Sequence, residues 1–318
     1  MTQFFASRAF RWTALILTFS LVFIAPAFSQ TFKVATGSAK GTYASMFKEL
    51  QGACGNDVTM SEVASTGSNQ NVDMLVGNQV NAAFVQTDVL HWRGRTEDLS
   101  AVKTLLALHR EAVHLVARAN SGIKQGGTLG FGKTEVVLSD ITSLAGLVVG
   151  AAGGSLTTAQ VIRMQSEVKF DVQEFDTNDF ALKALDAGTV QAVVLVGGAP
   201  LPSVAAMGPA YKLLAIPAAI AERLKNVYRP ITVNYSKLKA TGLQTVSTDA
   251  LFVTREYKTQ KMVEGLARFR ACALAKVDEL KETTGTHPAW QAVEPSNRGK
   301  WAYYELPEPM KVSGKGRQ

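Results

Sequence analysis

One hydrophobic pattern occurs twice in this chain, and it restricts the fold to the α/β class. From Thr31 a short β-like run places Phe32 and Val34 on one strand face, and a Gly/Ser-rich turn separates it from a helical apolar stripe at 43–50. Thr42 is placed to cap this helix. Residues 147–149 lead in the same way into the glycine turn 150–155 and a second helical stretch. A strand, a glycine turn and a helix in this order are the parts of a parallel α/β sheet.

Apolar positions in the two regions also match at a constant offset of 110 residues. Gly77 and Gly188 are the expected helix stops in the two regions, and the buried strands 80–85 and 190–196 follow them. The matched positions are Leu75, Val80, Ala82 and Phe84 in the first region and Leu185, Val190, Ala192 and Val194 in the second. Two α/β units of related layout predict a pair of similar lobes.

The length of 318 residues fits two lobes of roughly 100 to 150 residues each. Near the C-terminus, a strand at 250–253 precedes a long amphipathic helix at 259–281. This segment is again α/β, so we expect it to rejoin the first lobe rather than to form a third domain.

Residues 1–29 have the composition of a secretory signal peptide. They contain no acidic residue, Arg8 and Arg11 provide a positive start, and 12–25 is an almost unbroken apolar run. Ala27-Phe28-Ser29 has the small-x-small pattern of a cleavage site. We expect cleavage before Gln30 and a periplasmic mature protein. A retained membrane anchor is the alternative.

The mature chain lacks the minimum parts of most enzymes and nucleic-acid binders. Removing the two arginines of 1–29 leaves 31 basic and 26 acidic residues, a net charge of +5 that is scattered along the chain. This balance suits a small anion better than nucleic acid. A Ser-x-x-Lys pattern occurs at Ser45–Lys48 and at four other places, but its partner motifs are missing, as are the dinucleotide, hydrolase and zinc-protease signatures. We therefore expect no catalytic residue, no cofactor and no metal.

Small polar residues after predicted strands are the main functional signal. The segments 37–42, 65–68, 86–88 and 153–157 each combine hydroxyl side chains with free N–H groups at a helix start. Such groups hold a carboxylate without a cluster of arginines. Each segment alone can be simple helix capping, whereas four segments spread over both lobes indicate one anion site between the lobes.

The same segments carry a family resemblance. Residues 34–43 (VATGSAKGTY), 65–71 (STGSNQN) and 83–89 (AFVQTDV) resemble the solute receptors of TRAP transporters of the TAXI type. The likeness continues through 113–118 (VHLVAR), 153–157 (GGSLT) and 287–290 (HPAW), and so covers nearly the whole mature chain.

The resemblance implies a periplasmic-binding-protein type II fold, in which crossing strands join two α/β lobes that close over a ligand. Lobe 1 would comprise residues 30–118 and 226–318, and lobe 2 would comprise 119–225. The implied function is capture of a small organic anion, glutamate-like or a dicarboxylate, and its delivery to TRAP-type permease subunits. We expect a non-catalytic monomer. A periplasmic sensing subunit and, less favoured, a periplasmic enzyme on the same fold are the alternatives.

The resemblance also implies a ligand set from both lobes. One departure from the family pattern is Leu156, which stands where a glycine is common and would narrow the pocket. Tyr43 also fits a core aromatic position. A second ligand carboxylate would need a cation, for which Lys40, Arg110 and Arg229 are candidates. The implied ligand-binding residues are Gly37, Ser38, Thr42, Tyr43, Ser65, Thr66, Gly67, Ser68, Asn69, Gln86, Thr87, Gly154, Ser155, Leu156 and Thr157.

The two cysteines, Cys54 and Cys272, are too far apart in sequence for a local metal knuckle, and by themselves they could be paired or free. An exported protein permits a disulfide. In the implied fold the first helix and the long C-terminal helix belong to one lobe, so the resemblance favours a Cys54–Cys272 bridge.

Overall fold

The computed structural model describes residues 31–307 with the exception of residue 40 and residues 126–133. The predicted signal peptide, 1–29, lies outside the described residues. The first part of the chain forms β1 (Phe32–Ala35), α1 (Thr42–Cys54), β2 (Met60–Val63), α2 (Ser68–Val76), β3 (Ala82–Gln86), α3 (Thr87–Arg93) and β4 (Val102–Arg118). The middle part forms β5 (Lys124–Gln125), β6 (Thr134–Glu135), β7 (Val148–Ala152), α4 (Gly154–Gln165), β8 (Asp171–Phe175), α5 (Asn178–Asp186), β9 (Ala192–Gly198), α6 (Pro202–Ala205), β10 (Tyr211–Leu214) and α7 (Ala218–Arg223). The last part forms β11 (Arg229–Tyr235), β12 (Ala240–Arg255) and α8 (Gln260–Glu282).

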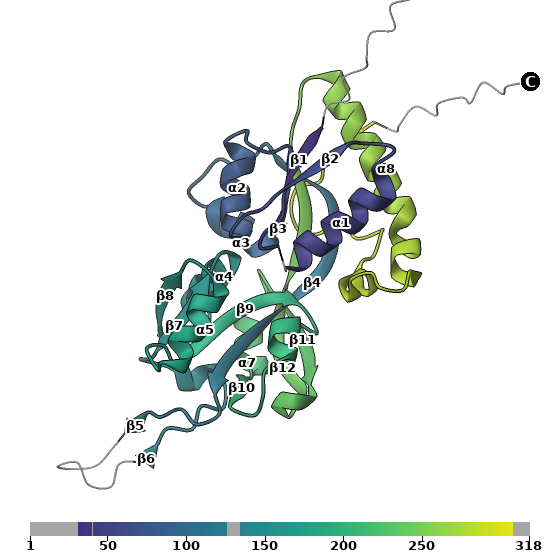
Figure 1. The fold of residues 1–318 in the computed structure, drawn as a ribbon. Coiled ribbons are helices and arrows are strands. Elements are labelled where there is room, and N and C mark those ends of the chain that lie inside the picture. The colour runs from purple at the N-terminus through teal and green to yellow at the C-terminus, as the bar shows by residue number, and fades with distance from the viewer. Residues whose placement is uncertain (1–30, 40, 126–133, 308–318) are drawn as a thin grey trace, which may run out of the picture. The chain divides into compact units, whose positions relative to one another are not determined.

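Two long antiparallel strands, β4 and β12, form the centre of the main sheet. The strand order is β2-β1-β3-β12-β4-β9-β7-β8, with β10 paired to β4 and β11 paired to β12. The pairs β1–β2, β1–β3, β7–β8 and β7–β9 are parallel, as expected for α/β units, whereas β4 and β12 are antiparallel to their neighbours. Figure 1 shows β4 and β12 continuing from β1–β3 toward β7–β9.

The buried apolar side chains form separate clusters toward the two ends of these long strands. One group, which we call the β1 side, contains β1 to α3, α8 and the 102–108 and 250–255 parts of β4 and β12. The other group, the β9 side, contains β7 to β11 and the 112–118 and 240–246 parts of the same strands. Residues 109–111 and 247–249 belong to neither cluster, and all of them are polar. The chain therefore has two apolar cores with a polar layer between them.

Most predicted elements are confirmed with small shifts in their bounds. The strands expected at 80–85 and 190–196 are β3 and β9, and the helix expected at 259–281 is α8. One expectation was wrong: Thr42 does not cap α1 but is its first residue, because the extended residue at the N-cap position is Gly41. Gly188 ends α5 as expected, with a φ of +75° that favours glycine.

The predicted disulfide is confirmed. Cys54, the last residue of α1, is bonded to Cys272 in α8, with their Cα atoms 5.9 Å apart. The bond joins two helices of the β1 side, which Figure 1 shows next to each other although 218 positions separate the cysteines. Among the described helices, none combines the length and the apolar run that a membrane span requires.

Candidate functional site

The polar layer contains a buried carboxylate at its centre. Glu111 of β4 is 3% exposed, and it lies in register with Thr248 of β12 and Gly198 of β9. The Tyr43 hydroxyl, which projects from α1, donates a hydrogen bond of 2.8 Å to Glu111 Oε2. Burial, reinforced by the neighbouring Glu111 charge, raises the pKa of Tyr43 well above its usual range. The phenol therefore stays protonated and acts as a donor to the carboxylate.

Tyr43 also has the core role that its position in the sequence allows. Its ring stacks on Phe84 of β3, with the ring centroids 5.2 Å apart. The ring therefore belongs to the core of the β1 side, while the hydroxyl belongs to the polar layer.

The starts of α2 and α4 meet at this layer. Asn69 of α2 donates from Nδ2 to the carbonyl oxygen of Gly153 at 2.9 Å, and Thr157 of α4 donates from Oγ1 to Asn69 Oδ1 at 3.1 Å. No side chain caps either helix, since the N-cap residues are Gly67 and Gly153. The first turn of α4 is nevertheless buried. A buried helix start without a cap offers free N–H groups and a positive partial charge to a bound anion.

Glycines allow the start of α4 to lie close to the turn before α2. At Gly153, where φ is +52°, a Cβ atom would lie 2.3 Å from the carbonyl oxygen of Thr66. At Gly154, a Cβ atom would lie 2.0 Å from Gln86 Oε1. The Thr66 oxygen belongs to the backbone, so glycine is required at 153 for the contact between the β1 side and the β9 side. At 154 the obstacle is the end of the flexible Gln86 side chain, which can shift.

Buried polar atoms without partners mark the same region. Gln86, at the end of β3, is 4% exposed, and its Oε1 has no hydrogen-bond partner although its backbone N–H donates to Ser68 Oγ at 3.1 Å. His109 is 1% exposed, and neither of its ring nitrogens forms a hydrogen bond. Its Nε2 lies 3.5 Å from Glu111 Oε1, which is ion-pair distance without hydrogen-bond geometry. Buried groups of this kind are costly unless something satisfies them.

A second buried carboxylate links the two sides. Asp88, at the start of α3, accepts hydrogen bonds from the hydroxyls of Thr158 in α4, at 2.6 Å, and Tyr228, at 2.8 Å. Thr248 of β12 donates to the other carboxylate oxygen at 3.4 Å, as does the backbone N–H of Val89 at 3.0 Å. Burial raises the pKa of Asp88 above its usual range, and the hydrogen bonds from Thr158 and Tyr228 oppose that rise. Asp88 thus ties α3 on the β1 side to α4 on the β9 side.

Replacing Tyr228 with phenylalanine should destabilise the protein by about 1–3 kcal/mol near neutral pH, since a hydrogen bond to a buried carboxylate is lost. The folded-state pKa of Asp88 is raised, so protonation of Asp88 adds stability as the pH falls through that value. In the wild type the Tyr228 hydrogen bond stabilises the ionised form of Asp88 and so lowers its pKa. The loss of unfolding free energy caused by Tyr228→Phe should therefore be smaller in acid, where Asp88 is protonated. Urea unfolding at pH values above and below the titration of Asp88 measures this change.

Tyr211→Phe is the matched control for Tyr228→Phe, because the Tyr211 hydroxyl donates to Asp186 at an exposed position. We expect that control to lie within about 0.5 kcal/mol of wild type at every pH. An equal effect of the two substitutions would contradict the buried link through Asp88.

The structure brings only part of the predicted ligand set to the polar layer. Of the others, Ser38 and Thr66 have exposed side chains, the Thr87 hydroxyl donates to the carbonyl oxygen of Asp249, and Leu156 packs on the apolar cluster of the β9 side. Gly37 and Ser65 lie in the adjacent turns, Gly37 beside the Tyr43 ring, and Thr42 is the first residue of α1. The residues that meet at the layer through the contacts described are Tyr43, Gly67, Ser68, Asn69, Gln86, Gly154 and Thr157, and Ser155 accepts a hydrogen bond from the backbone N–H of Val196 in β9.

None of the candidate cations from the sequence pairs with Glu111 in the described structure. Arg110 is exposed, and Arg229 lies 3.6 Å from Asp249. Lys40 lies outside the described residues.

Sequence reasoning missed Glu111 and His109 as site residues, and it named Asp88 only as part of the segment 86–88, not for its carboxylate. A signal for the first two was present, since they interrupt an apolar run from 105 to 117 that otherwise reads as a buried strand. Charged residues inside such a run are either paired or functional. Asp88 carried no comparable signal, because an acidic residue in the first turn of a helix is ordinary.

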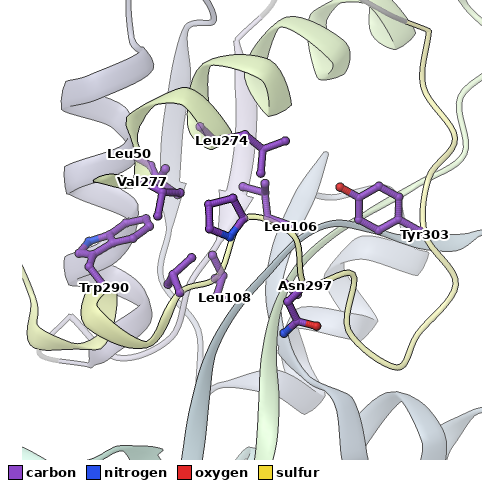
Figure 2. Close-up of a pocket in the computed structure, with 12 residues that line it drawn as sticks. Leu50, Leu106, Leu108, Leu274, Val277, Trp290, Asn297 and Tyr303 are labelled. Carbon is purple, nitrogen blue, oxygen red and sulfur yellow. The ribbon is translucent and has the colours of Figure 1, made fainter. Parts of the chain in front are cut away.

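Two cavities lie away from the predicted ligand set. Figure 2 shows the first, an apolar void beneath α8 that Leu106, Val277 and Trp290 help to line. Its volume of about 10 Å³ admits no solute larger than water. The second, of about 220 Å³, lies between α3 and α4 beside Asp88 and Gln165. Neither is lined by a residue of the predicted ligand set.

Within the described residues, no group of three or more His, Cys, Asp or Glu side chains is arranged to hold a metal ion.

Solved structures with the same architecture are solute-binding proteins. Tv2483 bound to L-arginine matches with a TM-score of 0.54 at 14% identity, over 83% of this chain and 92% of that one. The substrate binding protein of an amino acid ABC transporter matches with a TM-score of 0.50 at 10% identity, over 80% and 95%. A mutant of ArgBP from T. maritima matches with a TM-score of 0.50 at 15% identity, over 79% and 91%. The expected two-lobe periplasmic-binding-protein fold is therefore confirmed.

The sequence also matches the model of a known protein family. The NMT1-like family model matches residues 34–297, which include every element from β3 to α8 and the whole polar layer. The chain belongs to the NMT1-like family.

Proposed function

We propose that this chain is an extracytoplasmic solute-binding protein that holds one small organic solute between the β1 side and the β9 side. The observation that carries the proposal is the buried Gln86 Oε1, which has no hydrogen-bond partner and lies beside the uncapped start of α4. The buried His109 ring, which also lacks a hydrogen bond, lies beside Glu111 in the same polar layer. A bound solute would satisfy these groups, and its carboxylate would meet the N–H groups of α4. The family and the architecture of known solute-binding proteins support this proposal.

We propose that the two sides act as lobes that close over the solute and open to release it. The sequence suggests a return from lobe 2 to lobe 1 at residue 226. The buried contacts of β11 with the β9 side support a later return, within 247–249 of β12. Solute contacts made only in the closed form would shift the population toward that form.

The partner and the location follow from the sequence resemblance. We propose export through the cleaved segment 1–29, a monomeric receptor in the periplasm, and delivery of an organic acid or an acidic amino acid to TRAP-type permease subunits. The ligand set proposed from the sequence is retained, with Tyr43, Ser68, Gln86 and Gly154 as its inner members.

A thermal-unfolding panel tests the function. Mature protein stripped of co-purified ligand is heated with amino acids, monocarboxylates and dicarboxylates, sugars and phosphate esters. A solute present at 100 times its dissociation constant should add about 2.7 kcal/mol and raise the midpoint by several degrees. A flat response of well-folded protein across the whole panel would contradict solute binding.

An uptake experiment distinguishes a transport role of this chain from a sensing role. Vesicles that carry TRAP-type permease subunits should take up the labelled solute only with the receptor present, driven by an ion gradient without ATP. Uptake that needs ATP would reassign the receptor to an ABC transporter, and binding without uptake by either route would favour the sensing role. Chemical change of the solute would favour an enzyme.

A further inference from the structure

We propose that the solute carries an ammonium group and that Glu111 binds it, which makes the ligand an amino acid rather than an organic acid without an amino group. This inference rests on the proposed function and identifies the class of solute at the same site. It also changes the expectation from the sequence, which considered only anion-binding groups.

The first step is the charge balance of Glu111. The side chain is 4% exposed, and the Tyr43 hydroxyl is the one hydrogen-bond donor to its carboxylate within the described chain. An ionised carboxylate accepts about four hydrogen bonds. No lysine or arginine of the described residues forms an ion pair with it. A buried carboxylate with so few donors is costly unless a cation joins it.

The second step is the comparison with the other buried acids of the layer. Asp88 has donors from Thr158, Tyr228, Thr248 and Val89, and Asp249 has Arg229 at 3.6 Å. Asp88 is therefore satisfied by hydrogen bonds, whereas Asp249 has the guanidinium of Arg229 beside it. Glu111 has a single hydroxyl donor and no ion pair with a described lysine or arginine, so it is the acid that is available to a ligand.

The third step is the sign of the surrounding field. Glu111 and Asp88 are close enough for the Glu111 charge to contribute to the raised pKa of Asp88. A dicarboxylate would add two further negative charges to this buried region. The uncapped start of α4 can offset one carboxylate, but Arg229, the described cation beside an acid of the layer, already lies at Asp249.

The fourth step is the direction of the unsatisfied groups. Gln86 Oε1, the orphan next to Gly154, is an acceptor and needs an N–H or O–H donor. The layer therefore offers two acceptors, Gln86 Oε1 and Glu111, together with N–H donors at the start of α4. An α-amino acid matches this pattern, since its ammonium supplies three donors and its carboxylate accepts from the helix start.

His109 is the rival partner, because its Nε2 lies 3.5 Å from Glu111 Oε1. If an imidazolium at His109 neutralised Glu111 inside the protein, the site would gain nothing from an ammonium group on the solute. The two arrangements therefore predict different ligand preferences.

The experiment compares solutes that differ only in the amino group. Titration calorimetry on the mature wild-type protein uses L-glutamate against 2-oxoglutarate, L-alanine against pyruvate and L-arginine against its 2-oxo analogue. In the pair that binds, we expect the amino acid to bind about 10- to 100-fold more tightly, as for a hydrogen-bonded charged group. Equal affinity within the pair, or tighter binding of the oxo acid, would overturn the ammonium assignment while leaving solute binding intact.

Two variants test whether Glu111 is the residue that binds the ammonium group. Glu111→Gln keeps the shape and an acceptor for the Tyr43 hydroxyl, and it should remove most of the preference for the amino acid over its oxo analogue. Asp249→Asn is the matched control, a buried acid of β12 that is already paired with Arg229, and it should keep the preference within about threefold. An unchanged preference in folded Glu111→Gln would overturn the role of Glu111. If that variant does not fold, the solute pairs on wild type still decide the solute class.

If no member of the pairs binds, two outcomes remain. Binding of a dicarboxylate, a sugar or a phosphate ester in the thermal panel would overturn the amino-acid assignment alone. No binding by any solute would overturn the proposed function and this inference together.

Discussion

Replacing Gly153 with alanine should abolish solute binding while the protein stays folded. The new Cβ atom would lie 2.3 Å from the carbonyl oxygen of Thr66, which belongs to the turn before α2 on the opposite side of the polar layer. A backbone oxygen cannot rotate away as a side chain can, so the start of α4 must separate from this turn. That separation also breaks the hydrogen bonds that Asn69 makes to Gly153 and Thr157.

The apolar cores of the β1 side and the β9 side do not include Gly153, so each should remain packed in the variant. We expect the affinity for the solute identified by the thermal panel to fall by more than 100-fold, because a receptor that cannot close loses the contacts of one lobe. Titration calorimetry measures the affinity, and far-ultraviolet circular dichroism checks the fold.

Gly188→Ala is the matched control for Gly153→Ala. Gly188 also has a positive φ, +75°, but no atom lies within 4 Å of its Cβ position. It should cost about 1 kcal/mol of stability and leave the affinity unchanged. Equal loss of affinity in both variants would show backbone strain rather than the contact with Thr66 to be the cause. Normal binding by the Gly153 variant would show that closure at this contact is not required.

The fold was largely predictable because its parts leave local signals. The glycine turn at 37–41 and Gly153 mark where strands become helices, and Gly77 and Gly188 mark where helices end. The turn expected at 150–155 is shorter than predicted, because β7 continues to Ala152 and α4 begins at Gly154. The 17-residue strand β4 was not predictable from periodicity, because a run buried on both faces has no alternation to reveal its length. The crossing strands were expected only from the family resemblance.

The candidate site was predictable only in part, for a related reason. Helix starts with small polar residues can be located in a sequence, so the turns around Ser68 and Gly154 were identified. Which of their side chains face the polar layer depends on tertiary contacts. Leu156 follows Ser155 directly, yet Leu156 packs on the apolar cluster while Ser155 receives the N–H of Val196. Glu111 comes from another part of the chain, and only the sheet register brings it to these turns.

Loss of the disulfide should lower stability by about 2–5 kcal/mol without weakening solute binding. The bond joins Cys54 and Cys272 across 218 positions, a loop that contains the whole β9 side. In the chain-entropy model a closed loop of this length restricts the unfolded chain by about 5 kcal/mol, which is an upper expectation for a native bridge. Cys54 is the last residue of α1, whereas Tyr43, which reaches the polar layer, lies in the first turn of that helix. Cys272 lies on α8, which contributes no residue to the groups assigned to the solute.

The measurement is thermal unfolding of wild type, of wild type with reductant and of the Cys54→Ala, Cys272→Ala double variant. Both reduced wild type and the double variant should unfold roughly 5–15 °C lower. Reductant should not affect the double variant, which controls for its other effects. The affinity for solute should match in all three samples, because the bridge holds the two distant segments of the β1 side together and contacts none of the groups assigned to the solute. A large loss of affinity on reduction would mean instead that the geometry of the polar layer depends on the α1–α8 link, and it would extend the functional unit from the layer to the helices behind it.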